Sequence, residues 1–167
     1  MPWALGLAVL ALAVSGAAGC AVMRQPVLVV EDAGRARVLH RAPVVAGSTF
    51  VLSYVHSSEH VPVRGTFVVE ADGTLTARET AFAGFGPGLP EPKAGDSWRI
   101  EDGMIVVPSD GPRLPELLVH VVPITQHRLR LPSGEDLDLS TLMREGGAVR
   151  IRVNFLDSAP RREPTAR

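Results

Sequence analysis

The stretch that decides the fold is VPVRGTFVVEADGTLTARETAF, residues 61–82. Its outer segments, 61–70 and 75–82, carry β-branched and aromatic residues and show the alternation of apolar and polar positions that is typical of strands. Between them, Asp72-Gly73 is a dipeptide that tight hairpin turns favour, because both turn positions require positive φ. The stretch therefore predicts a β-hairpin.

The same period of two continues along the chain. A second Asp-Gly turn, at Asp102-Gly103, separates two further short apolar runs. Only residues 139–145 fit a helical turn or two, with Ser140 as the cap and Gly146-Gly147 as the end. Short strands separated by Gly and Pro predict an all-β fold, a small sandwich or barrel of antiparallel strands. Besides the hairpin, strands are expected at 27–30, 49–56, 98–100, 104–107, 117–122, 128–131, 136–139 and 149–155.

Composition fits a single packed domain. The chain has 167 residues, of which 46% are hydrophobic and 21% charged. The net charge is -1 with both signs mixed, which argues against a nucleic-acid partner. One cysteine permits neither an internal disulfide nor a cysteine-based zinc site. We expect one β domain at 26–156 and a flexible polar tail at 157–167.

The N-terminal segment is uncharged from Trp3 to Val22, and Ala4–Val14 has the length of a signal-peptide core. The small residues that lead to Cys20 resemble a bacterial lipoprotein signal, in which Cys20 would be lipidated. A cleaved secretory signal, an uncleaved membrane anchor and a buried cytosolic helix are the alternatives. We expect residues 1–22 to place the β domain outside the cytoplasm, in the cell envelope, as a lipoprotein or an inner-membrane-tethered periplasmic protein.

The densest polar cluster is HSSEH, residues 56–60, which has the H-x-x-E-H spacing of the inverted zincin motif. Those enzymes place both histidines on one face of a helix. Here the motif directly follows a predicted strand, and Pro62 leaves no room for a catalytic helix. The sequence favours a polar turn. A loop-borne metal site, and with it a metal-dependent hydrolase, is kept as an alternative on His56, Glu59 and His60.

Other candidate groups give weaker signals. Ser57 beside His56 does not form a nucleophile and base pair, because neighbours on a strand point to opposite faces. Residues 82–90, FAGFGPGLP, form a loop rich in Gly and Pro that suits either a tight crossover or a ligand contact. His120, inside the apolar run LLVHVVP, is expected to be structural, and His127 is expected to be exposed.

The 54–57 and 79–90 segments, in this order, resemble a bacterial family known as domain of unknown function 1850. The resemblance covers roughly residues 27–155. Where the family often carries a glutamate, this chain has Gly65, and Pro87 stands where the family has alanine. The residues that match the family pattern are Tyr54, His56, Ser57, Pro62, Val63, Phe67, Glu79, Thr80, Phe82, Phe85, Gly86, Gly88, Leu89 and Pro90.

The resemblance implies an exported protein encoded beside TAXI-type TRAP transporters, which import organic anions. It implies an accessory role without catalysis or cofactor, through binding of the transporter permease, its periplasmic solute-binding protein or a small ligand. A structural envelope module without a ligand is the remaining alternative. The expected binding surface consists of His56, Ser57, Glu79, Phe85, Gly86, Gly88 and Pro90.

Overall fold

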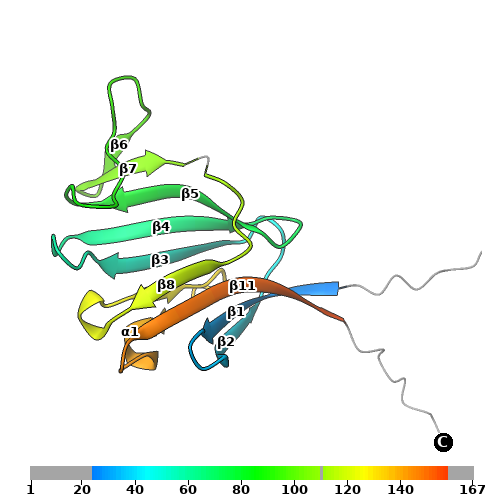
Figure 1. Cartoon of the computed structure of the whole chain (residues 1–167). Helices are drawn as coiled ribbons and strands as arrows, with labels where there is room; N and C mark the ends of the chain where they lie inside the picture. Colours follow the sequence, from blue (N-terminus) through cyan, green and yellow to red (C-terminus); the bar gives the residue numbers. More distant parts are fainter. Residues whose placement is uncertain (1–23, 110, 158–167) are drawn as a thin grey trace, which may run out of the picture.

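The computed structural model describes residues 24–109 and 111–157, which form two packed antiparallel sheets (Figure 1). The smaller sheet has the order β2-β1-β11-β8, and the larger has the order β10-β9-β3-β4-β5-β7-β6. The strands of the smaller sheet are β1 (Arg24–Asp32), β2 (Arg37–Pro43), β8 (Leu117–Val121) and β11 (Gly147–Asp157). Those of the larger sheet are β3 (Thr49–Val55), β4 (Pro62–Val69), β5 (Leu75–Phe82), β6 (Arg99–Glu101), β7 (Met104–Pro108), β9 (Arg128–Arg130) and β10 (Asp136–Asp138).

The position of β8 depends on the two connections that flank it. The chain leaves the larger sheet after β7, and Leu114 pairs with Leu75 in an isolated bridge on the way to β8. After β8, the 3-10 helix η1 (Pro123–Thr125) leads back to β9 in the larger sheet. Both ends of β8 are thus held against the larger sheet, which places this edge strand beside the inner face of β3, β4 and β5.

The core lies between the sheets and follows the two-residue period of the strands. Because successive side chains point to opposite faces, alternate residues of each strand are buried and the others face outward. The alternation is clear in β3, where Phe50 and Leu52 are buried. The buried cluster is made of Leu28, Val30, Ala42, Val44, Phe50, Leu52, Val69, Leu75, Leu117, Val121, Leu129, Leu131, Leu137, Leu139, Met143, Val149 and Ile151.

A buried carboxylate on β1 is paired with two arginines of the neighbouring strand. Glu31 is only 6% exposed, and its carboxylate lies 3.2 Å from both Arg150 and Arg152 of β11. A buried carboxylate requires such partners, since desolvation of an unpaired charge costs several kcal/mol. The pair of arginines therefore fixes β1 and β11 together on the face away from the core.

The predicted all-β class is confirmed, and both Asp-Gly turns join adjacent antiparallel strands. The sequence did not predict β2, because this edge strand carries Arg37 and Arg41 and shows no apolar run. The short helix α1 (Leu139–Leu142) exists, but the predicted cap was wrong. Its N-cap is Asp138, whose side chain accepts a hydrogen bond from the Thr141 N–H, and Ser140 is buried instead.

The β structure begins at Arg24 and reaches Asp157, slightly beyond both expected limits. The predicted signal or anchor at 1–22, including Cys20, and the tail from 158 lie outside the described residues. Within the described part of the chain, no helix is long and apolar enough to cross a membrane.

We expect Leu129→Ala to lower the free energy of unfolding by about 2–5 kcal/mol, because it leaves a cavity in a well-packed core. Leu129 is fully buried in β9, between Leu52 of β3 and Leu137 of β10. Urea denaturation measures the change. The control Ile124→Ala alters a side chain that is 69% exposed, and should stay within about 0.5 kcal/mol of the parent. Equal effects of the two substitutions would contradict the described core.

Candidate functional site

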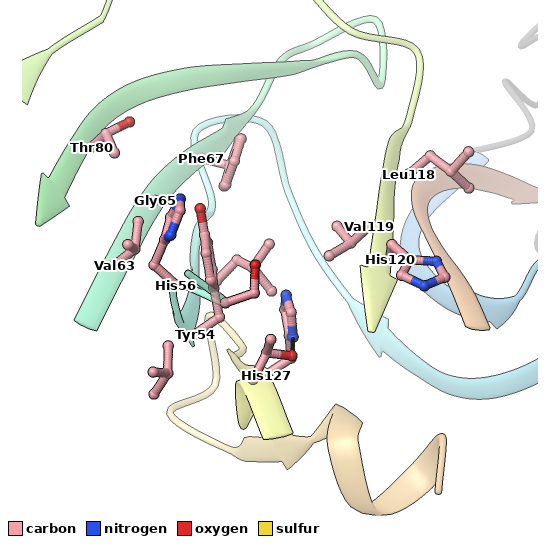
Figure 2. Close-up of a pocket in the computed structure, with 14 residues that line it drawn as sticks. Tyr54, His56, Val63, Gly65, Phe67, Thr80, Leu118, Val119, His120 and His127 are labelled. Atoms are coloured by element: carbon pink, nitrogen blue, oxygen red, sulfur yellow. Dashed lines mark hydrogen bonds between the residues drawn. The ribbon is translucent and has the colours of Figure 1, made fainter. Parts of the chain in front are cut away.

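A cleft of about 450 Å³ opens between the two sheets (Figure 2). On one side lie inward-facing residues of β3, β4 and β5, and on the other side lie Leu118, Val119 and His120 of β8. Thr125 and His127 also line the cleft. The cleft is mostly apolar, and among the described residues no aspartate, glutamate, lysine or arginine lines it. The remaining lining residues are Leu52, Tyr54, Val55, His56, Ser57, Val63, Gly65, Phe67 and Thr80.

The room in the cleft depends on Gly65, in the middle of β4. Gly65 pairs with Leu52 on β3 and with Thr80 on β5, so it faces the inner side where the smaller sheet offers no strand. A Cβ at this position would lie 3.0 Å from Cε2 of Phe67, and a larger side chain would take up part of the cleft. Gly65 has only a hydrogen atom in place of a side chain, and the side chain of the neighbouring Thr80 is small. The floor of the cleft is therefore hollow at this point.

Tyr54 and His127 form the polar wall of the cleft. Their rings stack with centroids 5.0 Å apart and planes 11° apart. Burial raises the pKa of the Tyr54 hydroxyl, so the phenol stays protonated and can donate a hydrogen bond. Burial, and then the charge of His120, lowers the pKa of His127 below its ordinary value of 6.5. Both side chains are therefore neutral near pH 7.

The neighbours of His127 select its tautomer. The Thr125 hydroxyl donates to the carbonyl of Val122 at 2.7 Å, and its oxygen lies 2.7 Å from Nδ1 of His127. Because the hydroxyl has one proton and the carbonyl can only accept, Nδ1 carries a proton and donates to Thr125. The lone pair is then on Nε2, which receives no hydrogen bond from the described residues. His127 thus offers an acceptor at the cleft, and Tyr54 offers a donor.

His56 stands at one end of the cleft, where β3 turns into β4. The turn over 57–59 is closed by two backbone hydrogen bonds, from the His56 N–H to Val61 O at 2.8 Å and from the His60 N–H to His56 O at 2.9 Å. His60 has φ of 55°, a left-handed conformation that no helix contains. The H-x-x-E-H sequence is therefore a hairpin loop, as the position of Pro62 suggested.

Both ring nitrogens of His56 are occupied. Nε2 lies 3.0 Å from the carbonyl of Pro87, which can only accept, so Nε2 carries the proton. Nδ1 then accepts from the Glu59 N–H at 3.4 Å, and it also lies 3.2 Å from the Ser58 hydroxyl oxygen, whose proton is donated to Glu59 Oε1. This pattern leaves His56 no free lone pair for a metal ion or for a base. Among the described residues, no three His, Cys, Asp or Glu side chains are grouped as metal ligands.

The hairpin loop and the glycine-rich loop pack against each other. The Ala83 N–H donates to Pro62 O at 3.2 Å, and a Cβ added at Gly86 would lie 2.5 Å from Cγ of Glu59. Gly86 therefore leaves the room that the Glu59 side chain occupies against this loop. Phe85 contacts Phe82 edge to face, with ring centroids 5.8 Å apart, and is 55% exposed.

The predicted surface residues divide into three groups. His56 and Ser57 line the cleft, whereas Phe85, Gly86, Gly88 and Pro90 lie in the loop that His56 holds. Glu79 does not join them. Its carboxylate is 2.9 Å from Arg99, and it lines a separate groove with Ser53, Arg64 and Thr66, on the outer face of the larger sheet.

A family model described as "Domain of unknown function (DUF1850)" matches residues 50–139, more than half of the chain. The chain belongs to this family. The match includes both the hairpin loop and the glycine-rich loop, and it ends at the first residue of α1. No curated protein and no solved structure matches the chain significantly.

In this DUF1850 chain, the two histidine expectations were wrong. His127 is 4% exposed, because the two-residue period places it on the same face as Leu129. His120 is exposed, because Leu117 and Val121 take the inward positions of β8. Extending the alternation of RLRL backwards by one residue would have found the buried histidine. No local signal marked Gly65 as the floor of a cleft, since that role depends on β8.

We expect stability to fall as pH drops through 6.5, because the unfolded chain then binds a proton that native His127 does not. The thermal midpoint, measured by calorimetry between about pH 7.5 and about pH 5.5, should depend less on pH in His127→Asn, since the amide does not titrate. The exposed His60→Asn is the control and should keep the parental dependence. An unchanged pH dependence in His127→Asn would contradict the assignment.

We expect His56→Ala to release the glycine-rich loop while the sandwich stays folded. Loss of the contact to Pro87 O removes a hydrogen bond worth about 1 kcal/mol, so amide exchange within 83–90 should rise about fivefold. Hydrogen exchange followed by mass spectrometry measures this. Ser57→Ala, at the neighbouring exposed position, should leave the loop unchanged. Equal exchange in both variants would show that His56 does not hold the loop.

Proposed function

We propose that this DUF1850 chain is a non-enzymatic accessory protein of the cell envelope that binds a protein of a TAXI-type TRAP uptake system through the cleft between its sheets. The observation that carries the proposal is the cleft itself. It has about 450 Å³ of room, an apolar lining and a few directed polar groups. Ligand sites in proteins commonly have this size and this chemistry.

The polar groups of the cleft suit recognition better than catalysis. A catalytic site needs a nucleophile or base with a free lone pair and a partner that activates it. Here the lone pair of His56 on Nδ1 is taken by the hairpin loop. The lone pair of His127 on Nε2 is free, but the partner of its Nδ1 is the Thr125 hydroxyl and no carboxylate among the described residues lines the cleft to activate it. Tyr54 and His127 instead present one donor and one acceptor on a rigid, stacked pair. The metal-dependent hydrolase is therefore not the function that we favour.

The family resemblance supplies the setting of the proposal. The resemblance implies an exported protein encoded beside a TAXI-type TRAP transporter, and the apolar segment 1–22 suits export or tethering at the inner membrane. In this setting the partners with access to the cleft are the periplasmic solute-binding protein and the outer surface of the permease. A small organic anion, the cargo of these transporters, is the competing occupant.

The test is binding of the full-length protein, purified in mild detergent, to the TAXI-type solute-binding protein and permease of the same genome. We expect Gly65→Val to weaken this binding about tenfold or more, because its side chain occupies the cleft and clashes with the partner. Gly65 does not have positive φ, and valine is a good strand residue, so the backbone of β4 accepts the substitution, while the Phe67 ring 3.0 Å from the added Cβ has to shift. Calorimetry measures the affinity, and the thermal midpoint verifies the fold.

The matched control is Thr66→Val, the next residue of β4, which faces the outer groove. It should bind as the parent does. Full binding by folded Gly65→Val, or no binding by the parent to either protein, contradicts the proposal. Binding of organic anions with equal loss in Gly65→Val would instead assign the cleft to the cargo.

A further inference from the structure

The four edge strands of the two sheets differ in charge. An unprotected edge offers free backbone N–H and C=O groups, and proteins block unwanted pairing with charged residues, prolines or bulges. β2, β6 and β10 each carry at least two formal charges, and the pairing of β1 with β2 also has a bulge. β8 reads LLVHV and contains no Asp, Glu, Lys or Arg. It is the one edge among the described strands without any of these four residues.

The free edge of β8 opens onto the cleft. β8 pairs with β11 on one side, and no other described backbone group bonds to residues 117–121. Three consecutive residues, Leu118, Val119 and His120, border the cleft, with the Val119 side chain toward Tyr54 and His127 and the other two side chains on the opposite face of β8 (Figure 2). Successive residues of a strand point to opposite faces, so all three can share one cavity only along the edge itself. The cleft therefore runs along the unpaired side of β8.

The dimensions of a sandwich show what fits there. The larger sheet has seven strands and the smaller has four, so β5, β7 and β6 continue past β8 (Figure 1). A further strand would lie about 4.8 Å from β8 and about 10 Å above the larger sheet. That position is over Gly65 and Thr80, where the floor is hollow. The cleft is the place of a missing fifth strand of the smaller sheet.

A second copy of this chain cannot supply that strand by antiparallel pairing. Antiparallel pairing of β8 with β8 of another molecule in one continuous sheet would put both larger sheets on the same side. Because each larger sheet extends past β8, the two extensions would occupy the same space. A single extended segment of another protein has no such extension.

We propose that the partner inserts one extended segment beside β8 and so completes the smaller sheet as its fifth strand. This inference rests on the proposed function, and it names how the partner is held. Backbone hydrogen bonds to β8 provide the affinity, and side chains of alternate residues enter the cleft over Gly65. The lining has no formal charge, so the inserted side chains are apolar or uncharged.

The probe is a short peptide of alternating valine and threonine, capped at both ends, with two N-methylated versions. In one version every odd amide is methylated, and in the other every even amide. Alternate amides of an added strand point to opposite sides, so only one version loses the hydrogen bonds to β8. We expect that version to bind at least about tenfold more weakly, since each lost bond costs about 1 kcal/mol, while the other binds like the parent peptide.

The protein for this experiment is the full chain in mild detergent. Leu118→Lys places a charge at the edge and should weaken peptide binding about tenfold, whereas Ile124→Lys in η1 should not. Both parent residues are more than 60% exposed, at 62% and 69%, so both variants fold. Hydrogen exchange should slow within 117–121 when the peptide binds.

The outcomes separate this inference from the proposed function. Absence of peptide binding, equal loss with both methylated peptides, or unchanged exchange within 117–121 each overturns strand addition. If the solute-binding protein or permease still binds in a Gly65-dependent way, the proposed function holds and only the mode of insertion fails. If the parent protein binds neither the peptide nor the solute-binding protein or permease, both the strand addition and the proposed function are rejected.

Discussion

The constraint on which the rest of the structure depends is the unequal size of its two sheets. Seven strands cannot be covered by four, so part of the inner face of the larger sheet has no opposite strand. A sandwich normally fills this space with side chains. Here Gly65 and Thr80 leave it open, and the edge of β8 borders the gap. The cleft therefore follows from the fold itself and needs no separate domain or lid.

Polar contacts around the cleft hold its loops and side chains in place, and none of them activates a group for catalysis. His56 joins the hairpin loop to the glycine-rich loop through Pro87, and Thr125 orients His127 against Tyr54. The hydrogen-bond partners of each histidine select its tautomer. Such a rigid, uncharged wall suits a partner that is recognised by shape and by a few hydrogen bonds. It also explains why residues that suggested an enzyme in the sequence form a structural brace.

The parts that could be predicted from sequence are those governed by neighbours in the chain. The Asp-Gly turns and the alternation around them located most strands, and the glycine-rich loop stood out by composition. β2 was missed because an edge strand needs little apolar surface. The burial of His120 and His127 was predicted the wrong way round, because it depends on which face of a short strand meets the other sheet. Glu79 was grouped with His56 by the family pattern, although the sheet separates them onto opposite faces.

The sequence by itself determined an all-β chain of short antiparallel strands, since alternation and turn residues act over a few positions. It also determined the family, through the ordered motifs around His56 and Pro90. Only the tertiary structure decided that β8 ends its sheet beside Gly65. The reason is physical: strand order and the overhang of one sheet past the other arise from contacts between residues more than 100 positions apart, such as the pairing of β1 with β11. No local pattern encodes which edge remains unpaired.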